Sequence, residues 1–290
     1  MDIIFQSLKK VFPTQNIENL KNKRVAIIGL GGVGSFTLEM IARLGIGHLI
    51  LMDLDDICSS NINRQLLATQ QSIGNSKVEE AQKRLKIINP IVTTDLFHEF
   101  YSDKTYQLLF NAKPDLIIDC MDSLKDKCHL INQSLINRIP LIISGSTAGR
   151  KNIALIKCDD LNFTFNDSLL YRVRKKLRKD YHFHREKKKA YDVLCVFSQE
   201  QILSEELIIH AHANAHSVNG VDQAEVEAEI LTENINTALP PSDHDFTSPK
   251  FSNCNGPLGV LPTITSTFGI WVAHYALMKL IENNNDHLNA

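Results

Sequence analysis

The sequence has no C-x-x-C pair, and its six cysteines are scattered along the chain. They stand at positions 58, 120, 128, 158, 195 and 254. This spacing indicates neither a zinc knuckle nor a disulfide framework, and it favours a reducing compartment. We therefore expect a cytoplasmic protein.

Neither a signal peptide nor a membrane span is apparent. Residues 1–15 lack the basic-then-apolar layout of a secretory signal, and no stretch of about 18 to 20 uncharged apolar residues occurs. The nearest approach, residues 258–277, contains several Thr and Ser, a Pro and His274. We expect a buried core helix there, and no membrane partner.

The chain also has little net charge, because 31 Lys and Arg face 33 Asp and Glu, for a formal charge of −2 at pH 7. As a total, this argues against a dedicated nucleic-acid binder. The distribution of the charges along the chain, however, is compatible with nucleic-acid binding. Residues 172–189 contain ten basic and two acidic side chains, whereas residues 204–249 contain nine acidic and no Lys or Arg. The near-zero charge is thus a cancellation between a basic segment and an acidic insertion.

The 290 residues, 43% hydrophobic and 22% charged, have the composition of a folded globular protein. Short runs rich in Val and Ile predict strands, and apolar residues at helical spacing predict helices between them. The predicted strands are 25–29, 48–53, 116–120, 141–144, 153–157 and 193–197, and the first two helices are 35–43 and 78–88. This alternation predicts an α/β fold with a Rossmann-like, doubly wound, mostly parallel sheet and a C-terminal extension of further strands and helices.

A glycine-rich turn stands between the first predicted strand and the first predicted helix. It reads Gly29-Leu30-Gly31-Gly32-Val33-Gly34. Its glycines allow a tight turn and a close approach of backbone to phosphate, and the helix N-terminus offers free N–H groups. Asp53 ends the next predicted strand, about 20 residues further on, where it would accept a hydrogen bond from a ribose hydroxyl. The turn predicts a nucleotide site without deciding between NAD and ATP.

Charged residues at the following strand ends favour ATP. Arg64 and Lys77 can neutralise charge on the phosphates as pyrophosphate leaves, and Asp122 can hold Mg²⁺ by oxygen ligation. A hydride-transfer site would need an apolar slot for nicotinamide instead. The alternative is that the two cations are surface charges and Asp122 a helix N-cap. The predicted nucleotide-binding residues are Gly29, Gly31, Gly32, Gly34, Asp53, Asp55, Ser60, Asn61, Arg64, Gln65, Lys77, Asp122 and Ser123, with Arg64, Lys77 and Asp122 as catalytic residues.

This constellation resembles the ubiquitin-activating-type (ThiF/MoeB-like) adenylating enzymes. That family combines a Gly-rich turn, an acidic strand end, S-N-x-x-R-Q, a lysine in G-x-x-K and an aspartate in D-x-x-D. The present sequence matches at Gly29, Gly31, Gly32, Gly34, Asp53, Ser60, Asn61, Arg64, Gln65, Lys77 and Asp122. The resemblance implies a homodimer that activates a carboxylate as an acyl-adenylate. It also implies that Asp53 holds the ATP ribose, that Asn61, Arg64 and Lys77 hold the phosphates, and that Asp122 holds magnesium.

Further stretches resemble the branch of that family that dehydrates threonylcarbamoyladenosine beside the tRNA anticodon. They are residues 42–47, 60–65, 88–90, 172–179, 196–200 and 256–269, of which the last three are the more branch-specific. In the implied reaction the threonyl carboxylate attacks the α-phosphate of ATP, and the carbamoyl nitrogen then closes a ring with release of AMP. This chemistry needs no catalytic cysteine. A sulfur-transfer or thioester role for Cys195 or Cys254 stays open.

The basic segment supports an RNA substrate independently. If residues 170–181 are helical, Leu170, Val173, Leu177 and Tyr181 form one apolar stripe. The cations Arg172, Lys175, Lys176 and Lys179 then lie on the other side. Such a helix would present a cationic ridge to RNA phosphates; the alternative is an ordinary solvated face. The predicted RNA-binding residues are Arg172, Arg174, Lys175, Lys176, Arg178 and Lys179.

We accordingly assign residues 1–150 to an ATP-binding adenylation core. Residues 151–290 are then the C-terminal part of the same domain, with the basic segment 172–189 and the acidic insertion 204–249, in which 221–234 could form a polar helix.

Two features of the sequence depart from the pattern of the family. Residues 1–14 offer only Lys9 and Lys10 where family members carry an arginine, and the insertion holds His210, His212 and His216 at a spacing that could bind a metal.

Two other functions remain open at this point. One is adenylation of the C-terminal Gly-Gly of a ubiquitin-like sulfur-carrier protein, with a sulfur-transfer or sulfur-acceptor protein as partner. The other is a noncatalytic, nucleotide-responsive binding protein. A sulfur-carrier activator has no obvious need for a cationic ridge, whereas an enzyme that acts on tRNA does. The sequence therefore favours an ATP- and Mg²⁺-dependent, AMP-forming enzyme with tRNA as its partner.

Overall fold

The computed structural model describes residues 5–202 and 258–286. All of these except residues 201 and 202 belong to one compact unit, formed by Met1–Glu200 with Cys254–Ala290. The acidic insertion 204–249, its predicted helix 221–234, and His210, His212 and His216 lie outside the described residues, as does Cys254.

A seven-stranded sheet forms the centre of this unit, in the order β3-β2-β1-β4-β5-β7-β6. Neighbouring strands are parallel except for β6, which pairs antiparallel with β7. The strands are β1 Arg24–Ile28, β2 His48–Met52, β3 Thr93–Phe97, β4 Leu116–Asp119, β5 Leu141–Ser144, β6 Ile156–Asp160 and β7 Leu194–Ser198. This confirms the predicted doubly wound, mostly parallel sheet, because the order reverses direction at β1.

Two strands differ from the sequence prediction. Residues 153–155 form a 3₁₀ helix, and β6 starts only at Ile156, so the strand predicted at 153–157 is shifted along the chain. Asn152 accounts for this shift, since its side chain caps the 3₁₀ helix by accepting a hydrogen bond from the Ala154 N–H. Strand β3 was not predicted. It is an edge strand whose residues are half-buried or exposed, so its sequence lacks a continuous apolar run.

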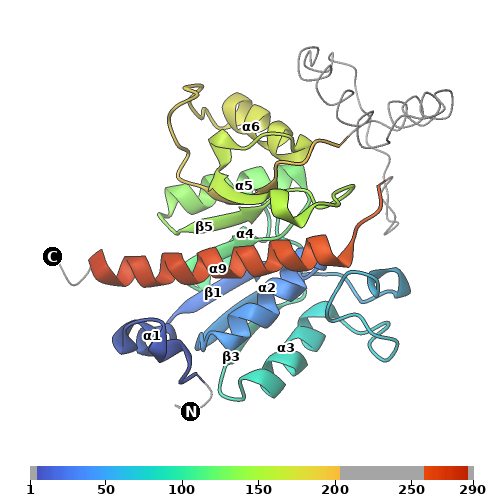
Figure 1. Cartoon of the computed structure of the whole chain (residues 1–290), viewed down its shortest axis with the longest axis vertical. Coiled ribbons are helices and arrows are strands. Elements are labelled where there is room, and N and C mark those ends of the chain that lie inside the picture. The colour runs from blue at the N-terminus through green and yellow to red at the C-terminus, as the bar shows by residue number, and fades with distance from the viewer. Residues whose placement is uncertain (1–4, 203–257, 287–290) are drawn as a thin grey trace, which may run out of the picture. The chain divides into compact units, whose positions relative to one another are not determined.

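Helices cover both faces of the sheet (Figure 1). Apolar side chains from α1, α2, α3 and α9 pack on one face, and those from α4, α5 and α6 pack on the other. The helices are α1 Thr14–Leu20, α2 Gly32–Arg43, α3 Lys77–Ile88, α4 Tyr106–Asn111, α5 Leu124–Ile136, α6 Ser168–Asp180 and α9 Pro262–Asp286. The result is a three-layer α/β/α unit with both faces of the parallel strands buried.

Helix α9 crosses the first face beside α2 (Figure 1). Their backbones approach closely at Gly269, where an added Cβ would lie 2.7 Å from the carbonyl oxygen of Val33. Within the described residues, Pro262–Glu282 is long and apolar enough to span a membrane by composition, but 56% of its most apolar window is buried. That burial agrees with the predicted core helix.

Candidate functional site

The glycine-rich turn lies at the carboxyl end of β1, where the chain enters α2. Gly29 has a positive φ of 85°, and Gly31 occupies the N-cap position of α2. Gly34 faces back onto the turn, since an added Cβ would lie 1.9 Å from the carbonyl oxygen of Gly29. At Gly31 the nearest atom to an added Cβ is 3.9 Å away. The turn therefore leaves open space at the N-terminus of α2, which suits a phosphate.

Asp53 follows β2, and its carboxylate connects the glycine-rich turn to the turn after β2. One carboxylate oxygen accepts a hydrogen bond of 2.6 Å from the backbone N–H of Leu30, and the other accepts one of 2.9 Å from the N–H of Asp55. Burial raises the pKa of Asp53, although Lys77 and the two backbone donors oppose the shift. The carboxylate thus fixes the glycine-rich turn from the position predicted for ribose binding.

Lys77 is the first residue of α3, and its ammonium group lies against two carboxylates. The Nζ atom is 2.6 Å from Asp55 Oδ2 and 3.8 Å from Asp53 Oδ1. The Lys77 side chain is only 5% exposed, whereas that of Asp55 is 53% exposed. An ammonium group has three donors, so the contact with Asp55 leaves donors for phosphate oxygens.

Residues 59–66 carry the other predicted phosphate ligands. A short 3₁₀ helix, Ser59–Asn61, starts the segment, and Asn61 Oδ1 accepts a hydrogen bond from the Cys58 N–H. Asn61 and Gln65 are buried, whereas Ser60 is exposed. Arg64 is half-buried and donates from one guanidinium nitrogen to the carbonyl of Ser60 and the side chain of Asn63.

The segment is fastened to the helices of the first face. Ser35 in α2 accepts a hydrogen bond of 3.0 Å from the Leu66 N–H. Thr265 in α9 contacts both parts of the site. Its hydroxyl lies 3.4 Å from the carbonyl oxygen of Arg64. Its methyl group faces Gly32, where an added Cβ would lie 2.9 Å from Thr265 Cγ2. The structure thus brings the Arg64 segment beside the glycine-rich turn.

Asp122 and Ser123 lie in the turn between β4 and α5. Asp122 is exposed, and Ser123 is the N-cap residue, with its hydroxyl 2.6 Å from a carboxylate oxygen of Asp126. The turn borders the first one, because an added Cβ at Gly29 would lie 3.1 Å from the carbonyl of Cys120. Asp122 therefore shares the carboxyl edge of the sheet with the glycine-rich turn.

Two residues that hold this turn were missed by the sequence analysis. Asp119 and Lys127 form an ion pair of 2.8 Å with both side chains 0% exposed, and Asp119 also accepts a hydrogen bond from the Met121 N–H. Burial raises the pKa of Asp119, against the opposing effect of Lys127. Asp119 was visible as the first aspartate of D-x-x-D, but nothing in the sequence marks Lys127 as its partner.

The residues at this edge fit ATP and magnesium. The free N-terminus of α2, the open space at Gly31 and the cations Lys77 and Arg64 suit a triphosphate. The exposed carboxylate of Asp122 suits Mg²⁺, which commonly takes one or two carboxylates and completes its coordination with phosphates and water. Among the described residues, no cluster of three or more His, Cys, Asp or Glu forms a protein-only metal site.

Four described cysteines are poor nucleophiles. Burial raises the pKa of Cys120, Cys128 and Cys158 to about 12, and that of Cys195 well above the usual value. A thiol must ionise to act as a nucleophile. Full burial of Cys195 therefore argues against a sulfur-transfer role for this thiol.

Helix α6 separates apolar from basic side chains largely as predicted. Leu170, Val173 and Leu177 are fully buried. Arg172, Lys175 and Lys179 are exposed, whereas Lys176 and Arg178 are half-buried. The ammonium group of Lys176 lies 2.5 Å from the Asp180 carboxylate. Arg178 donates hydrogen bonds to the Tyr191 hydroxyl and to the side chain of Asn162.

Arg174 differs from its prediction as an RNA-binding residue. It is buried and donates hydrogen bonds to the Thr164 hydroxyl and the Leu161 carbonyl. Its position, one residue after Val173 on the helix, turns the guanidinium inward. Arg174 therefore anchors α6 rather than facing solvent.

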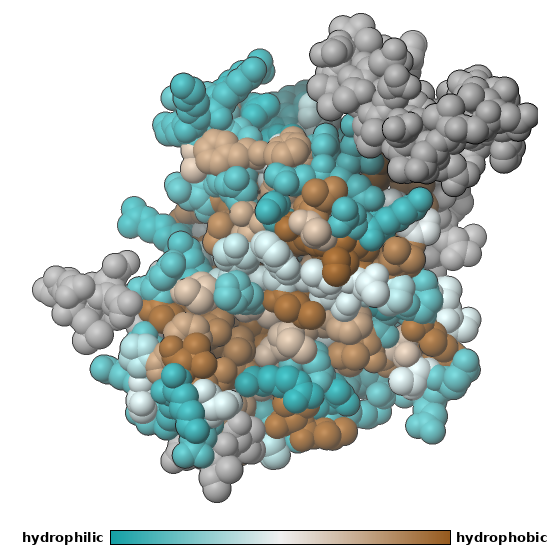
Figure 2. Space-filling view, in the orientation of Figure 1, coloured by the Kyte–Doolittle hydropathy of each residue, from teal (hydrophilic) through white to brown (hydrophobic). Residues whose placement is uncertain are grey.

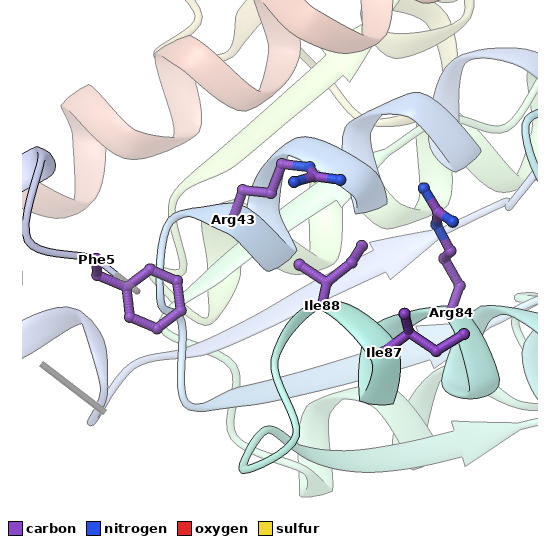
Figure 3. A pocket seen from close by; sticks show the side chains of 5 residues that line it. All are labelled: Phe5, Arg43, Arg84, Ile87 and Ile88. Atoms are coloured by element: carbon purple, nitrogen blue, oxygen red, sulfur yellow. The ribbon is translucent and has the colours of Figure 1, made fainter. Parts of the chain in front are cut away.

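A separate pocket of about 320 Å³ lies away from this edge, lined by Phe5, Arg43, Arg84, Ile87 and Ile88 (Figure 3). It lies at the C-terminal ends of α2 and α3, whereas Gly31 and Lys77 stand at the N-terminal ends of the same helices. Both arginines already bind the carboxylate of Glu39. The pocket brings no catalytic group together.

Comparisons with known proteins agree with these motifs. The model of the ThiF family matches residues 6–289. The tRNA threonylcarbamoyladenosine dehydratase of Haemophilus influenzae is 31% identical over 97% of this chain and 94% of its own, and that of Escherichia coli is 27% identical over 96% and 93%.

Solved structures show the same fold. The E. coli tRNA N6-threonylcarbamoyladenosine dehydratase TcdA, in complex with ATP, superposes with a TM-score of 0.77 at 24% identity, covering 98% of this chain and 96% of that one. The chain thus belongs to the ThiF family, in the branch formed by the tRNA threonylcarbamoyladenosine dehydratases.

Proposed function

We propose that the protein uses ATP to dehydrate threonylcarbamoyladenosine in tRNA, next to the anticodon, through a carboxyl-adenylate. The observation that carries the adenylation chemistry is the meeting of three turns at one edge of the sheet. They are the glycine-rich turn after β1, the Asp53 turn after β2 and the Asp122 turn after β4. The full-length relatives supply the substrate class.

In the first step a carboxylate oxygen of the threonyl group attacks the α-phosphorus of ATP. The bond between that phosphorus and the β-phosphate oxygen breaks, and pyrophosphate leaves. Lys77 and Arg64 are placed to neutralise the charge that develops on the phosphates. Arg64 has five N–H donors, and the described contacts use only one of its nitrogens.

Asp53 and Asp122 would orient the nucleotide. Asp53 accepts one backbone hydrogen bond on each oxygen, which leaves lone pairs for ribose hydroxyls. Asp122 would hold Mg²⁺, which supplies Lewis-acid charge neutralisation at the phosphates. Asn61, Gln65, Ser60 and Ser123 would make further contacts with the nucleotide.

In the second step the carbamoyl nitrogen attacks the activated carbonyl carbon. The bond to AMP breaks, the nitrogen loses a proton, and a ring forms. The oxygen of the lost water leaves in AMP, which is a far better leaving group than hydroxide. The step needs no enzyme nucleophile, which agrees with the raised pKa values of Cys120 and Cys195.

The exposed cations of α6 and the basic segment 172–189 would bind the tRNA backbone. Arg172, Lys175 and Lys179 contribute directly, with Lys176 and Arg178 beside them. Phosphate contacts of this kind release counterions, so binding should weaken steeply with salt. An enzyme with this substrate would work in the cytoplasm, where tRNA resides.

A second copy of the chain would cover part of α9. Apolar and weakly polar side chains gather over this helix in the space-filling view (Figure 2). Leu261, just before α9, is 44% exposed, and Ile270 within α9 is 47% exposed. A homodimer would bury such side chains. Analytical ultracentrifugation of the purified protein at micromolar concentration tests whether the chain forms this dimer.

The reaction itself is tested by mass spectrometry of nucleosides from tRNA that carries threonylcarbamoyladenosine. Incubation with protein, ATP and Mg²⁺ should lower the mass of that nucleoside by one water and form AMP. Omission of ATP, or the R64A variant, should prevent both. An unchanged nucleoside with active, folded protein would exclude the proposed function. In parallel, pyrophosphate exchange stimulated by a small protein ending in Gly-Gly would favour sulfur-carrier activation instead.

A further inference from the structure

Exposed aromatic side chains are concentrated at the start of α6. Among the described residues, four Phe or Tyr side chains are exposed: Phe100, Phe163, Phe165 and Tyr171. The last three lie within nine residues and are 36%, 47% and 48% exposed. Aromatic side chains normally bury most of their area in a folded protein. Their concentration within nine residues makes this segment a candidate binding surface.

The rings stand on rigid supports. Phe165 packs edge-on against the buried Phe197 of β7, with ring centroids 5.7 Å apart. Tyr171 lies in the first turn of α6, where its backbone N–H donates to the carbonyl of Asp167. The inner side of α6 is held by Leu170 and Val173, both fully buried. A rigid ring loses little conformational entropy when a ligand packs on it.

Lys175 lies on the same face of α6 as Tyr171, and Arg172 is the next residue in the chain. Lys175 follows Tyr171 by four residues, and side chains at this spacing are neighbours. Arg172 is adjacent, and both cations are exposed. An aromatic ring among cations suits single-stranded nucleic acid, whose bases stack while its phosphates meet the charges. A protein partner would favour a core depleted of lysine.

This face is anchored to the edge of the sheet that carries the nucleotide site. The Asp167 carboxylate accepts a hydrogen bond from the Leu170 N–H, which caps α6, and another of 2.8 Å from the Ser146 N–H. Ser146 follows β5 at its carboxyl end. Gly145 beside it has no room for a side chain, since an added Cβ would lie 2.5 Å from Asp167 Oδ2. One buried carboxylate thus joins the aromatic face to the edge.

We propose that Tyr171 is a base-stacking residue, on which an unpaired base of an RNA loop packs while the neighbouring phosphates lie against Arg172 and Lys175. The inference rests on the proposed function for the identity of the substrate and adds a residue that contacts an unpaired base of it. The protein reads a single-stranded loop, where bases are free to stack on a ring, and not the duplex stem alone.

The test uses the full chain and an RNA hairpin whose loop carries 2-aminopurine, a base whose fluorescence is quenched by stacking. Wild type and Y171F should bind the hairpin and quench the loop base. The Y171A and Y171L variants should lose the quenching, and Y171A should bind about 5- to 150-fold more weakly, the effect typical of one stacked base. The I136A variant, which changes a 65% exposed side chain on α5, should bind like wild type.

The salt dependence of hairpin binding distinguishes the contribution of base stacking from that of charge. Y171A should keep the wild-type slope of log affinity against log salt, because the ring carries no charge, whereas R172A should lower the slope by about one. Equal affinity and equal quenching in Y171A and wild type would overturn the proposal. So would a change in the subunit state of Y171A in light scattering, because the ring would then pack against protein.

The outcome is separable from that of the proposed function. The hairpin assay contains no ATP and no modified base. If wild type dehydrates the tRNA nucleoside but Tyr171 has no effect on hairpin binding, the stacking proposal alone falls. If quenching depends on Tyr171 but no dehydration occurs, the proposed reaction alone falls.

Discussion

At the scale of single residues, the buried pair of Asp119 and Lys127 controls the turn that presents Asp122. Asp119 ends β4, binds the Met121 N–H in the turn and meets Lys127 from the first half of α5. Both charges are out of water, so each depends on the other. Both side chains are 0% exposed, so the pair acts by fixing the turn, and we class both as positioning residues.

We expect K127M to lower the free energy of unfolding by about 3 to 5 kcal/mol, because it leaves the Asp119 carboxylate buried and unpaired. Urea unfolding measures this loss. The double variant D119N/K127M should lose less than K127M alone, since the amide that replaces the carboxylate would still accept from the Met121 N–H without a buried charge. A double variant less stable than K127M would contradict the ion-pair account.

Substitutions at two glycines of the first turn, Gly34 and Gly31, should differ in their effects on stability and on nucleotide binding. G34A places a Cβ 1.9 Å from the Gly29 carbonyl and must displace α2, so we expect a lower melting temperature as well as lost ATP binding. G31A meets no atom closer than 3.9 Å, so it should melt near wild type yet bind ATP more weakly, because its methyl group fills the space for phosphate. Calorimetry of both variants with and without ATP measures the difference.

Single residues were predictable where they belong to a local motif. The glycine-rich turn and Asp53 were found from spacing alone, because a turn between strand and helix depends on neighbouring residues. Lys127 and the inward direction of Arg174 were not, because each depends on a partner brought by another element.

At the scale of elements, Glu39 joins α2 to α3. Its carboxylate binds Arg84 from α3 and Arg43 from its own helix, and its side chain is 7% exposed. Burial opposes its ionisation, but the hydrogen bonds and charges of the two arginines outweigh burial and lower the pKa of Glu39 below 4.5. The same contacts occupy the arginines of the pocket in Figure 3.

This pKa predicts a pH dependence of stability. A carboxylate whose pKa is lower in the folded than in the unfolded state adds stability above about pH 4.5, and the contribution is lost as pH falls through the folded-state pKa. We expect E39Q to reduce the free energy of unfolding by about 1 kcal/mol at pH 7, since both arginines are partly exposed. The difference from wild type should shrink as pH is lowered towards 3. A gap that widens on acidification would exclude this role.

A cap links α6 to the strand β5. Asp167 accepts from Leu170 and from Ser146, so D167N can keep only one of these bonds, because its amide nitrogen is a donor. We expect a loss of about 1 to 2 kcal/mol in unfolding free energy and weaker hairpin binding. A D167N variant that melts and binds like wild type would remove the proposed anchor. S168A, which changes an exposed neighbour, is the matched control.

Elements were predictable where their burial is uniform. The central strands β1, β2, β4 and β5 are buried and apolar and were found from sequence. The edge strand β3 was missed because half-burial on an edge leaves no apolar run. Strand β6 was misplaced because its start depends on the cap at Asn152.

At the scale of the whole molecule, ATP should stabilise the folded protein, because it binds the edge of an assembled sheet and not the unfolded chain. At a free ATP concentration of about 100 times its dissociation constant, the gain is about 2.7 kcal/mol. The melting temperature should rise with ATP in wild type and in R172A, whose exposed cation lies on α6. It should rise much less in R64A. An equal rise in R64A would remove Arg64 from the nucleotide site.

The sequence by itself determined the class of fold, the glycine-rich turn and the basic segment, because these arise from composition, periodicity and local spacing. Only the tertiary structure decided that the turns after β1, β2 and β4 meet at one edge and that Lys77 lies against Asp55. It also decided that Arg174 turns inward while Tyr171 stays outside. Such relations join residues far apart in the chain, and the order of parallel strands and the burial of each helix face set them.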